Sequence, residues 1–149
     1  MSKVCIFDTT DSMVKVSGEH GRKVVVRNPN NEKYKRSQVD GCLVNNMTAA
    51  DWVISKISVG DVIIELKGKD VDHAVDQVKK TIDYWILNKM VNGRISSLIV
   101  CSEYPRFDTK IQRARDFLAR KYRAPLHVVT KNMEFEFDAL LSMRGPLKV

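Results

Sequence analysis

The chain has 149 residues, of which 25 are Lys or Arg and 18 are Asp or Glu, so its formal net charge is +7. This length suits a single domain spanning residues 1–149, because two domains would each have to build a core from about 75 residues. A hydrophobic fraction of 44% with 29% charged residues excludes wholesale disorder. No apolar run approaches the roughly 20 residues that cross a bilayer, and no signal peptide is recognisable. We therefore expect a cytoplasmic protein with no membrane partner.

The cysteines Cys5, Cys42 and Cys101 form no CxxC pair and are odd in number. This pattern predicts neither a disulfide framework nor a four-cysteine zinc site. Cys42 and Cys101 stand among aliphatic residues, so we expect them to be small buried hydrophobic residues.

The first half of the chain is rich in β-strand signals. Gly18-Glu19-His20-Gly21 separates two β-branched runs and predicts a hairpin, and Gly60 marks a second turn. The strands are expected at residues 14–17, 23–27, about 38–44, 51–55 and 61–67. Together they predict an antiparallel meander.

The second half alternates helices with strands. Apolar residues recur with a 3.6-residue period from Val71 to about Val91, which predicts an amphipathic helix with Asp70 as its N-cap. The further elements are a strand at 95–102, a helix at about 108–122 and a strand at 125–130. Strands alternating with helices imply parallel pairing. The predicted fold is therefore α/β: a mixed central sheet with an antiparallel N-terminal meander, flanked by two main helices.

The C-terminal segment fits two interpretations. Residues 134–137 alternate like an edge strand, whereas residues 139–141 are compatible with a helix. The sequence leaves both open.

An acidic cluster lies on the predicted hairpin around Gly60. If paired residue numbers sum to 116, Ser55 faces Asp61 and Asp51 faces Glu65, while Lys67 projects on the same face as Glu65. Opposed like charges are destabilising, so Lys67 or a divalent cation must offset them. A carboxylate pair suits Mg²⁺. On spacing alone, an exposed salt bridge between Glu65 and Lys67 is the alternative interpretation.

These residues and their order resemble the PD-(D/E)xK nuclease superfamily, which has a restriction-endonuclease-like fold. The resemblance covers about residues 38–102, within a core expected at about 38–130. It rests on Ala50-Asp51-Trp52-Val53-Ile54, on Val62-Ile63-Ile64-Glu65-Leu66-Lys67-Gly68, and on a following helix that contains Ala74 and Gln77.

The resemblance implies a Mg²⁺-dependent (or Mn²⁺-dependent) endonuclease that hydrolyses phosphodiester bonds, with DNA expected in preference to RNA. Asp51, Glu65 and the carbonyl of Leu66 would bind the metal ion. Lys67 would position or activate water, and Gln77 would support the site or contact the phosphate backbone. The alternative is a catalytically inactive nuclease-like domain that acts as a nucleic-acid-binding or assembly module.

Asp40 competes with Asp51 for the position of the first acid. A tight hairpin through residues 45–49 would place Asp40 near Ser55 and away from Glu65, so Asp51 is preferred. Many members of the superfamily also carry an additional Glu on an early helix. The first 35 residues of this chain contain strands and loops instead, which leaves that position unassigned.

Positive charge is concentrated in two segments, residues 22–36 and 106–123, which carry +5 each. Clustered basic residues are typical of surfaces that bind nucleic acid phosphates. The residues expected to do so are Arg106, Lys110, Arg113, Arg120, Lys121, Lys33, Lys35 and Arg36. A domain of this size that engages both strands of a duplex would need a partner copy, so a homodimer is the expected assembly on such a substrate.

Overall fold

The computed structural model describes residues 4–66, 70–102 and 109–144. Two residues of the predicted site, Lys67 and Arg106, lie outside the described residues. The strands are β1 (Ile6–Thr9), β2 (Met13–Ser17), β3 (Lys23–Arg27), β4 (Tyr34–Gln38), β5 (Trp52–Lys56), β6 (Gly60–Leu66), β7 (Arg94–Val100), β8 (Leu126–Val129) and β9 (Met133–Phe135). The helices are α1 (Val71–Leu87), α2 (Thr109–Tyr122) and α3 (Phe137–Leu141), with a 3₁₀ turn at Glu19–Gly21.

Six strands form a mixed sheet in the order β1-β4-β5-β6-β7-β8. Neighbours from β1 to β6 pair antiparallel, whereas β7 pairs parallel with both β6 and β8. This confirms the predicted α/β fold, with an antiparallel meander that enters a parallel half. A smaller sheet has the order β2-β3-β9, in which β2 and β3 form the predicted hairpin, so these two strands are not part of the meander in the large sheet and β1 stands beside β4 instead.

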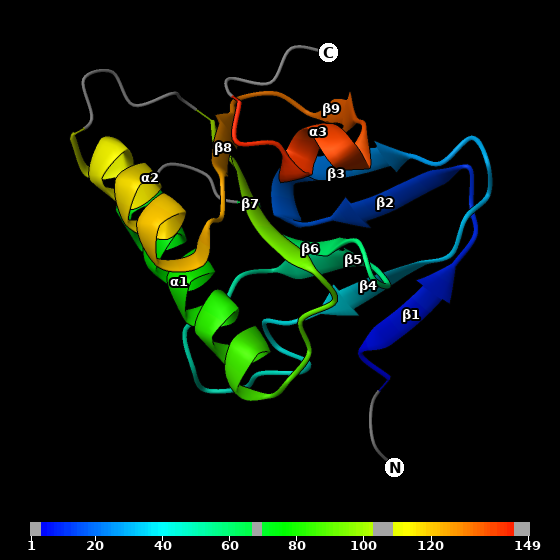
Figure 1. Ribbon diagram of the computed structural model, residues 1–149, viewed down its shortest axis with the longest axis horizontal. Helices are drawn as coiled ribbons and strands as arrows, with labels where there is room; N and C mark the ends of the chain where they lie inside the picture. Colours follow the sequence, from blue (N-terminus) through cyan, green and yellow to red (C-terminus); the bar gives the residue numbers. More distant parts are fainter. Residues whose placement is uncertain (1–3, 67–69, 103–108, 145–149) are drawn as a thin grey trace.

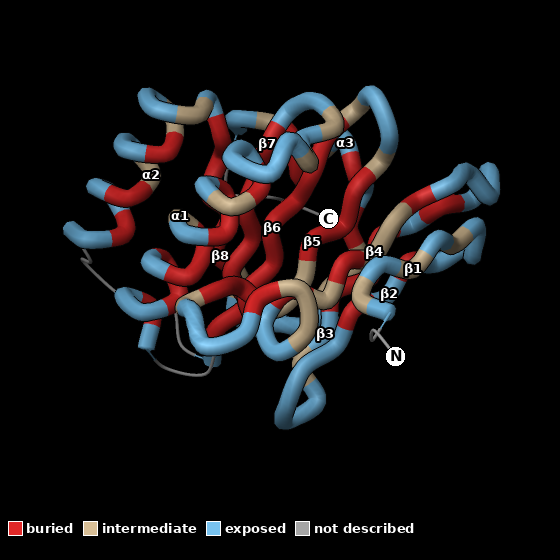
Figure 2. Tube along the Cα trace, turned by 90° about the horizontal axis from the view of Figure 1, so that it is seen from below, coloured by how far each residue is buried: buried red, intermediate tan, exposed pale blue. Residues whose placement is uncertain are grey.

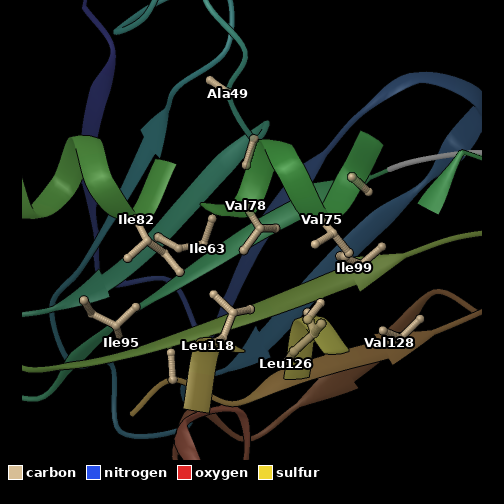
Figure 3. Close-up of a cluster of buried hydrophobic side chains, with 14 of the residues drawn as sticks. Ala49, Ile63, Val75, Val78, Ile82, Ile95, Ile99, Leu118, Leu126 and Val128 are labelled. Atoms are coloured by element: carbon tan, nitrogen blue, oxygen red, sulfur yellow. The ribbon is translucent and has the colours of Figure 1, made fainter. Parts of the chain in front are cut away.

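The two faces of the large sheet carry different layers. Figure 1 shows α1 and α2 on one side, and the small sheet with α3 on the other. Alternation along β6 supplies both cores, because Ile63 packs with the helices while Ile64 packs with the small sheet. In the close-up of the helix-side core, Val75 and Val78 of α1 lie over Ile63 and Ile99 of the sheet (Figure 3). The central strands are therefore buried along most of their length, whereas α1 and α2 alternate buried and exposed residues (Figure 2).

Helix α1 begins and ends for local reasons. Asp70 is the predicted N-cap: its Oδ1 accepts a hydrogen bond of 3.0 Å from the backbone N–H of His73. The helix ends at Leu87, four residues before the expected end, and Ile86 is 46% exposed rather than part of the buried stripe. No helix within the described ranges combines the length and the apolar character needed to span a bilayer.

The chain departs from the predicted elements around β4. The expected strand at 38–44 is instead β4 at Tyr34–Gln38, followed by a turn in which Gly41 has φ +76°. The polar sequence of β4 gives no strand signal. The segment is a strand because β1 and β5 pair with it on both sides. At the other end of the chain, both interpretations of residues 134–141 are realised in part, as β9 and α3.

Cys5 and Cys42 form a disulfide with a Cα–Cα distance of 5.7 Å, so the expectation of no disulfide framework, with Cys42 as a small buried hydrophobic residue, missed this bond. Cys42 is half-buried, whereas Cys101 is buried as expected, with its Sγ 3.6 Å from the carbonyl oxygen of Val129. The two bonded cysteines are 37 residues apart in sequence. They meet because the chain before β1 lies beside the end of β4, where the backbone N–H of Gln38 donates to the carbonyl of Cys5.

His127 on β8 makes the stability of the fold dependent on pH. Burial lowers the pKa of His127 below its ordinary value of 6.5, against the opposing effect of the carbonyls of Leu140 and Ser142. Since the unfolded chain binds this proton more readily, the free energy of unfolding should fall as pH drops below 6.5 towards the lowered value. Urea denaturation at pH 7.0 and about pH 5.5 measures this loss. We expect His127→Gln to reduce it and His73→Gln, an exposed histidine, to leave it unchanged; equal losses in all three proteins would contradict the assignment.

Candidate active site

The pairing of β5 with β6 brings two carboxylates together. The register joins Ser55 to Asp61 and Val53 to Ile63, which confirms the predicted alignment. The ladder ends one pair before Asp51 and Glu65. Beyond it, the backbone N–H of Asp51 donates to Glu65 Oε1 at 3.1 Å, and the N–H of Leu66 donates to Asp51 Oδ2 at 2.8 Å. Side-chain carboxylates thus replace the backbone carbonyls as hydrogen-bond acceptors at this end of the hairpin.

Each of these carboxylates accepts a backbone hydrogen bond from the neighbouring segment. Glu65 is 2% exposed, and Asp51 is half-buried. A buried carboxylate is costly unless it is hydrogen-bonded or paired, and two of them side by side also repel one another. The backbone donors offset part of this cost, and a cation at the same place would offset more.

Gln77 of α1 adds an amide to the same corner of the fold. Its Nε2 donates to the carbonyl of Ala49 at 3.1 Å, which orients the amide. Thr81 fixes α1 against the same segment: its Oγ1 accepts from the N–H of Ala50 at 2.7 Å and donates to the carbonyl of Gln77 at 2.8 Å. Gln77 Oε1 is buried and has no hydrogen-bond partner among the described residues. A buried acceptor left unsatisfied costs about 1–3 kcal/mol, so this oxygen is suited to a ligand.

A pocket of about 940 Å³ opens where β6 and β7 end. Crevices at the carboxyl ends of parallel strands are a common place for ligands in open α/β sheets. Acidic and polar side chains dominate its lining, and Arg22 is the one Lys or Arg among the described lining residues. The lining residues are Ser17, Gly18, Glu19, His20, Arg22, Gln38, Asp40, Asp51, Trp52, Glu65, Leu66, Asp70, Gln77 and Ser102.

Asp40 lies on this pocket too, so its predicted position near Ser55 is wrong. Its backbone N–H donates to the carbonyl of Ala50 at 3.1 Å, and Val39 pairs in the same way with Asp51. The connection between β4 and β5 contains its own turn at 39–44 instead of a tight hairpin at 45–49, which shifts the register. Asp40 and Asp51 are therefore both available to the site.

The predicted nucleic-acid-binding residues of α2 are exposed and lie outside this pocket. They are Lys110, Arg113, Arg120 and Lys121. Lys110 forms an ion pair of 2.8 Å with Asp72 near the start of α1, two residues after Asp70 of the pocket lining. At the other end of α2, Tyr122 donates to Asp83 of α1, and burial together with this carboxylate raises the pKa of Tyr122 to about 12.

Two of the predicted basic residues at β4, Lys33 and Arg36, have structural partners. Lys33 forms an ion pair of 3.6 Å with Asp8 of β1. Arg36 donates from Nη1 to the carbonyl of Lys15 at 3.1 Å and lies over the ring of Phe7. Lys35 and Arg36 lie on β4 and Lys33 directly precedes it, and none of the three lines the pocket.

The described residues fit a magnesium or manganese ion with few protein ligands. No three Asp, Glu, His or Cys side chains within the described ranges are grouped closely enough to hold an ion by themselves. Mg²⁺ often binds through one or two carboxylates and retains several waters. Asp51 and Glu65, with the unsatisfied oxygen of Gln77, match that donor set. Hard oxygen ligands of this kind also suit Mn²⁺.

Sequence reasoning missed the tip of the β2–β3 hairpin, whose residues 17–20 and 22 line the pocket. The sequence signal was only a Gly-rich turn, because contact between this hairpin and β6 depends on how the two sheets pack. Among known proteins, no family model, no curated protein and no solved structure matches the chain.

Proposed function

We propose that this protein is a Mg²⁺-dependent nuclease that hydrolyses phosphodiester bonds in nucleic acid, with DNA as the favoured substrate. The observation that supports it best is the arrangement of Asp51 and Glu65, which lie directly before β5 and near the end of β6. Each carboxylate accepts a hydrogen bond from the backbone of the other segment. The order of elements from β5 through β6 and α1 to β7 also agrees with the resemblance to the PD-(D/E)xK superfamily.

The proposed roles follow the chemistry of the lining residues. Asp51, Glu65 and the carbonyl of Leu66 would hold the ion. Gln77 would support the site, with its Oε1 as the acceptor that faces the bound ion or its waters. A bound Mg²⁺ supplies polarisation of the phosphoryl oxygen and lowers the pKa of a coordinated water. Lys67 follows Leu66 in the sequence, and we assign it the positioning of the attacking water by resemblance.

The basic residues of α2 would bind phosphates away from the cleaved bond. Such contacts depend little on sequence and weaken with salt, because binding releases counterions. A homodimer would allow both strands of a duplex to be cut.

Cleavage assays on single-stranded and duplex DNA and RNA, with Mg²⁺, Mn²⁺ or EDTA, test the proposal. We expect cleavage of at least one substrate that requires the metal ion, and calorimetry should detect Mn²⁺ binding that Asp51→Asn weakens by at least about 10-fold. If no substrate is cut and no metal binds, the nuclease proposal fails. Nucleic acid binding without metal binding would favour the alternative, a nuclease-like binding or assembly module.

A further inference from the structure

The tip of the β2–β3 hairpin, residues 17–22, packs directly against the end of β6. The indole Nε1 of Trp52 donates to the carbonyl of Ser17 at 3.0 Å. Gly18 lies so close to Leu66 that a Cβ placed on it would be 3.0 Å from Leu66 Cδ1 and 3.2 Å from Leu66 Cβ. The hairpin tip therefore rests on the residue that follows Glu65, and it forms one wall of the 940 Å³ pocket.

The backbone of this tip is closed by hydrogen bonds at both of its ends. The N–H of Gly18 donates to the carbonyl of Arg22 at 2.9 Å. Asn132 binds the backbone on both sides of Arg22. Its Nδ2 donates to the carbonyl of Gly21 at 2.8 Å, and its Oδ1 accepts from the N–H of Lys23 at 3.0 Å. The backbone that carries Arg22 is thus held in place by hydrogen bonds within the protein, which favours recognition because little order has to be imposed on binding.

The charges around the pocket are unbalanced. The described carboxylates that line it are Glu19, Asp40, Asp51, Glu65 and Asp70. Arg22 faces the same pocket, is half-buried, and takes part in none of the ion pairs between described side chains. An anionic substrate entering here would be repelled by the carboxylates unless cations compensate. The planar guanidinium group is suited to bind two oxygens of one phosphate.

We propose that Arg22 binds a backbone phosphate of the substrate and positions the phosphodiester against Asp51 and Glu65. This rests on the proposed nuclease function and adds a substrate-binding residue from the small sheet to it. The hairpin would then act as a clamp on the nucleic acid strand on the side of the sheet opposite α1.

Steady-state cleavage and oligonucleotide binding test this role with Arg22→Gln, Arg22→Lys and the control Lys23→Gln. Lys23, the first residue of β3, directly follows Arg22, is exposed and lies outside the pocket lining. We expect Arg22→Gln to raise KM about 10- to 100-fold, the range for loss of a charge-assisted hydrogen bond, with kcat changed less than about threefold. Arg22→Lys should recover part of the loss, and Lys23→Gln should match the wild-type protein. Thermal melting with and without Mn²⁺ should show all variants folded and equally stabilised by the ion.

Binding of a fluorescent oligonucleotide in Ca²⁺, followed by anisotropy, provides a readout that does not need turnover. An Arg22→Gln protein that cleaves and binds like wild type overturns the role of Arg22 and leaves the nuclease proposal standing. Conversely, if no protein cleaves but Arg22→Gln still loses at least about 10-fold in affinity while Lys23→Gln does not, the phosphate contact is supported and the nuclease proposal fails.

Discussion

Glu65→Gln is expected to lower kcat/KM for metal-dependent cleavage by at least about 10³-fold, because a metal ion supplies several kcal/mol of transition-state stabilisation that the neutral amide would no longer secure. The fold should survive, since Gln retains an oxygen that can accept the hydrogen bond from Asp51. The measurements are initial rates at saturating Mg²⁺ and the free energy of unfolding in urea, which should stay within about 1.5 kcal/mol of wild type.

A matched control is Glu134→Gln, since Glu134 also lies on a strand but pairs with Arg27 and is absent from the pocket lining. It should retain wild-type rates. Asp51→Asn should resemble Glu65→Gln, whereas Asp40→Asn should lose less than about 10-fold, because only Asp51 is bonded directly to the segment of Glu65 and Leu66. Wild-type cleavage by Glu65→Gln would refute the assignment of the metal ligands. If Asp40→Asn lowered kcat/KM more than Asp51→Asn, Asp40 and not Asp51 would be assigned as the first metal-binding acid.

Asp61→Ala is expected to lower the free energy of unfolding by about 3–5 kcal/mol, the range for removing one partner of a buried, charged network. Asp61 is fully buried on β6. Its carboxylate accepts from Ser55 Oγ at 2.6 Å, from Trp85 Nε1 at 3.3 Å, and from the backbone N–H and Nδ2 of Asn92 at 2.7 and 2.8 Å. Alanine would leave a void and unsatisfied donors from β5, α1 and the loop before β7.

Urea denaturation monitored by circular dichroism measures this loss. Asp61→Asn should be milder, because it keeps one acceptor and nearly the same volume. Asp76→Ala is the control: Asp76 is exposed on α1 and pairs only with Lys80 at 3.9 Å among the described residues, so its loss should be within about 0.5 kcal/mol. A stability change in Asp61→Ala no larger than in the control would show that the network contributes little.

Local pattern explains why much of the candidate site was predictable. The register of β5 and β6 follows from a short hairpin with alternating side chains, so the sequence alone is enough to place Asp51 and Glu65 together. The start of α1 follows from Asp70, and its buried face follows from a 3.6-residue period that also brings Gln77 inward. The pattern does not predict how the β5–β6 ladder ends. There the carboxylates of Asp51 and Glu65 accept backbone hydrogen bonds that carbonyl groups accept in the rest of the ladder.

Asp40 and Asp61 show where local reasoning stops. The position of Asp40 depends on the turn at 39–44, and the mostly apolar sequence of that turn is equally compatible with a strand. Asp61 was recognised only as the partner of Ser55, because its donors on α1 and at Asn92 come from segments that are 24 and 31 residues away.

By itself, the sequence determined most of the elements, the α/β class, the two hairpins and the acidic pair, since each depends on residues that are neighbours along the chain or across one tight turn. Only the tertiary structure decided that Cys5 bonds Cys42, that β9 joins β3, and that Arg22 enters the pocket. These contacts join distant segments whose meeting is set by how the two sheets and the helices bury their apolar faces, and short-range periodicity carries no information about that packing.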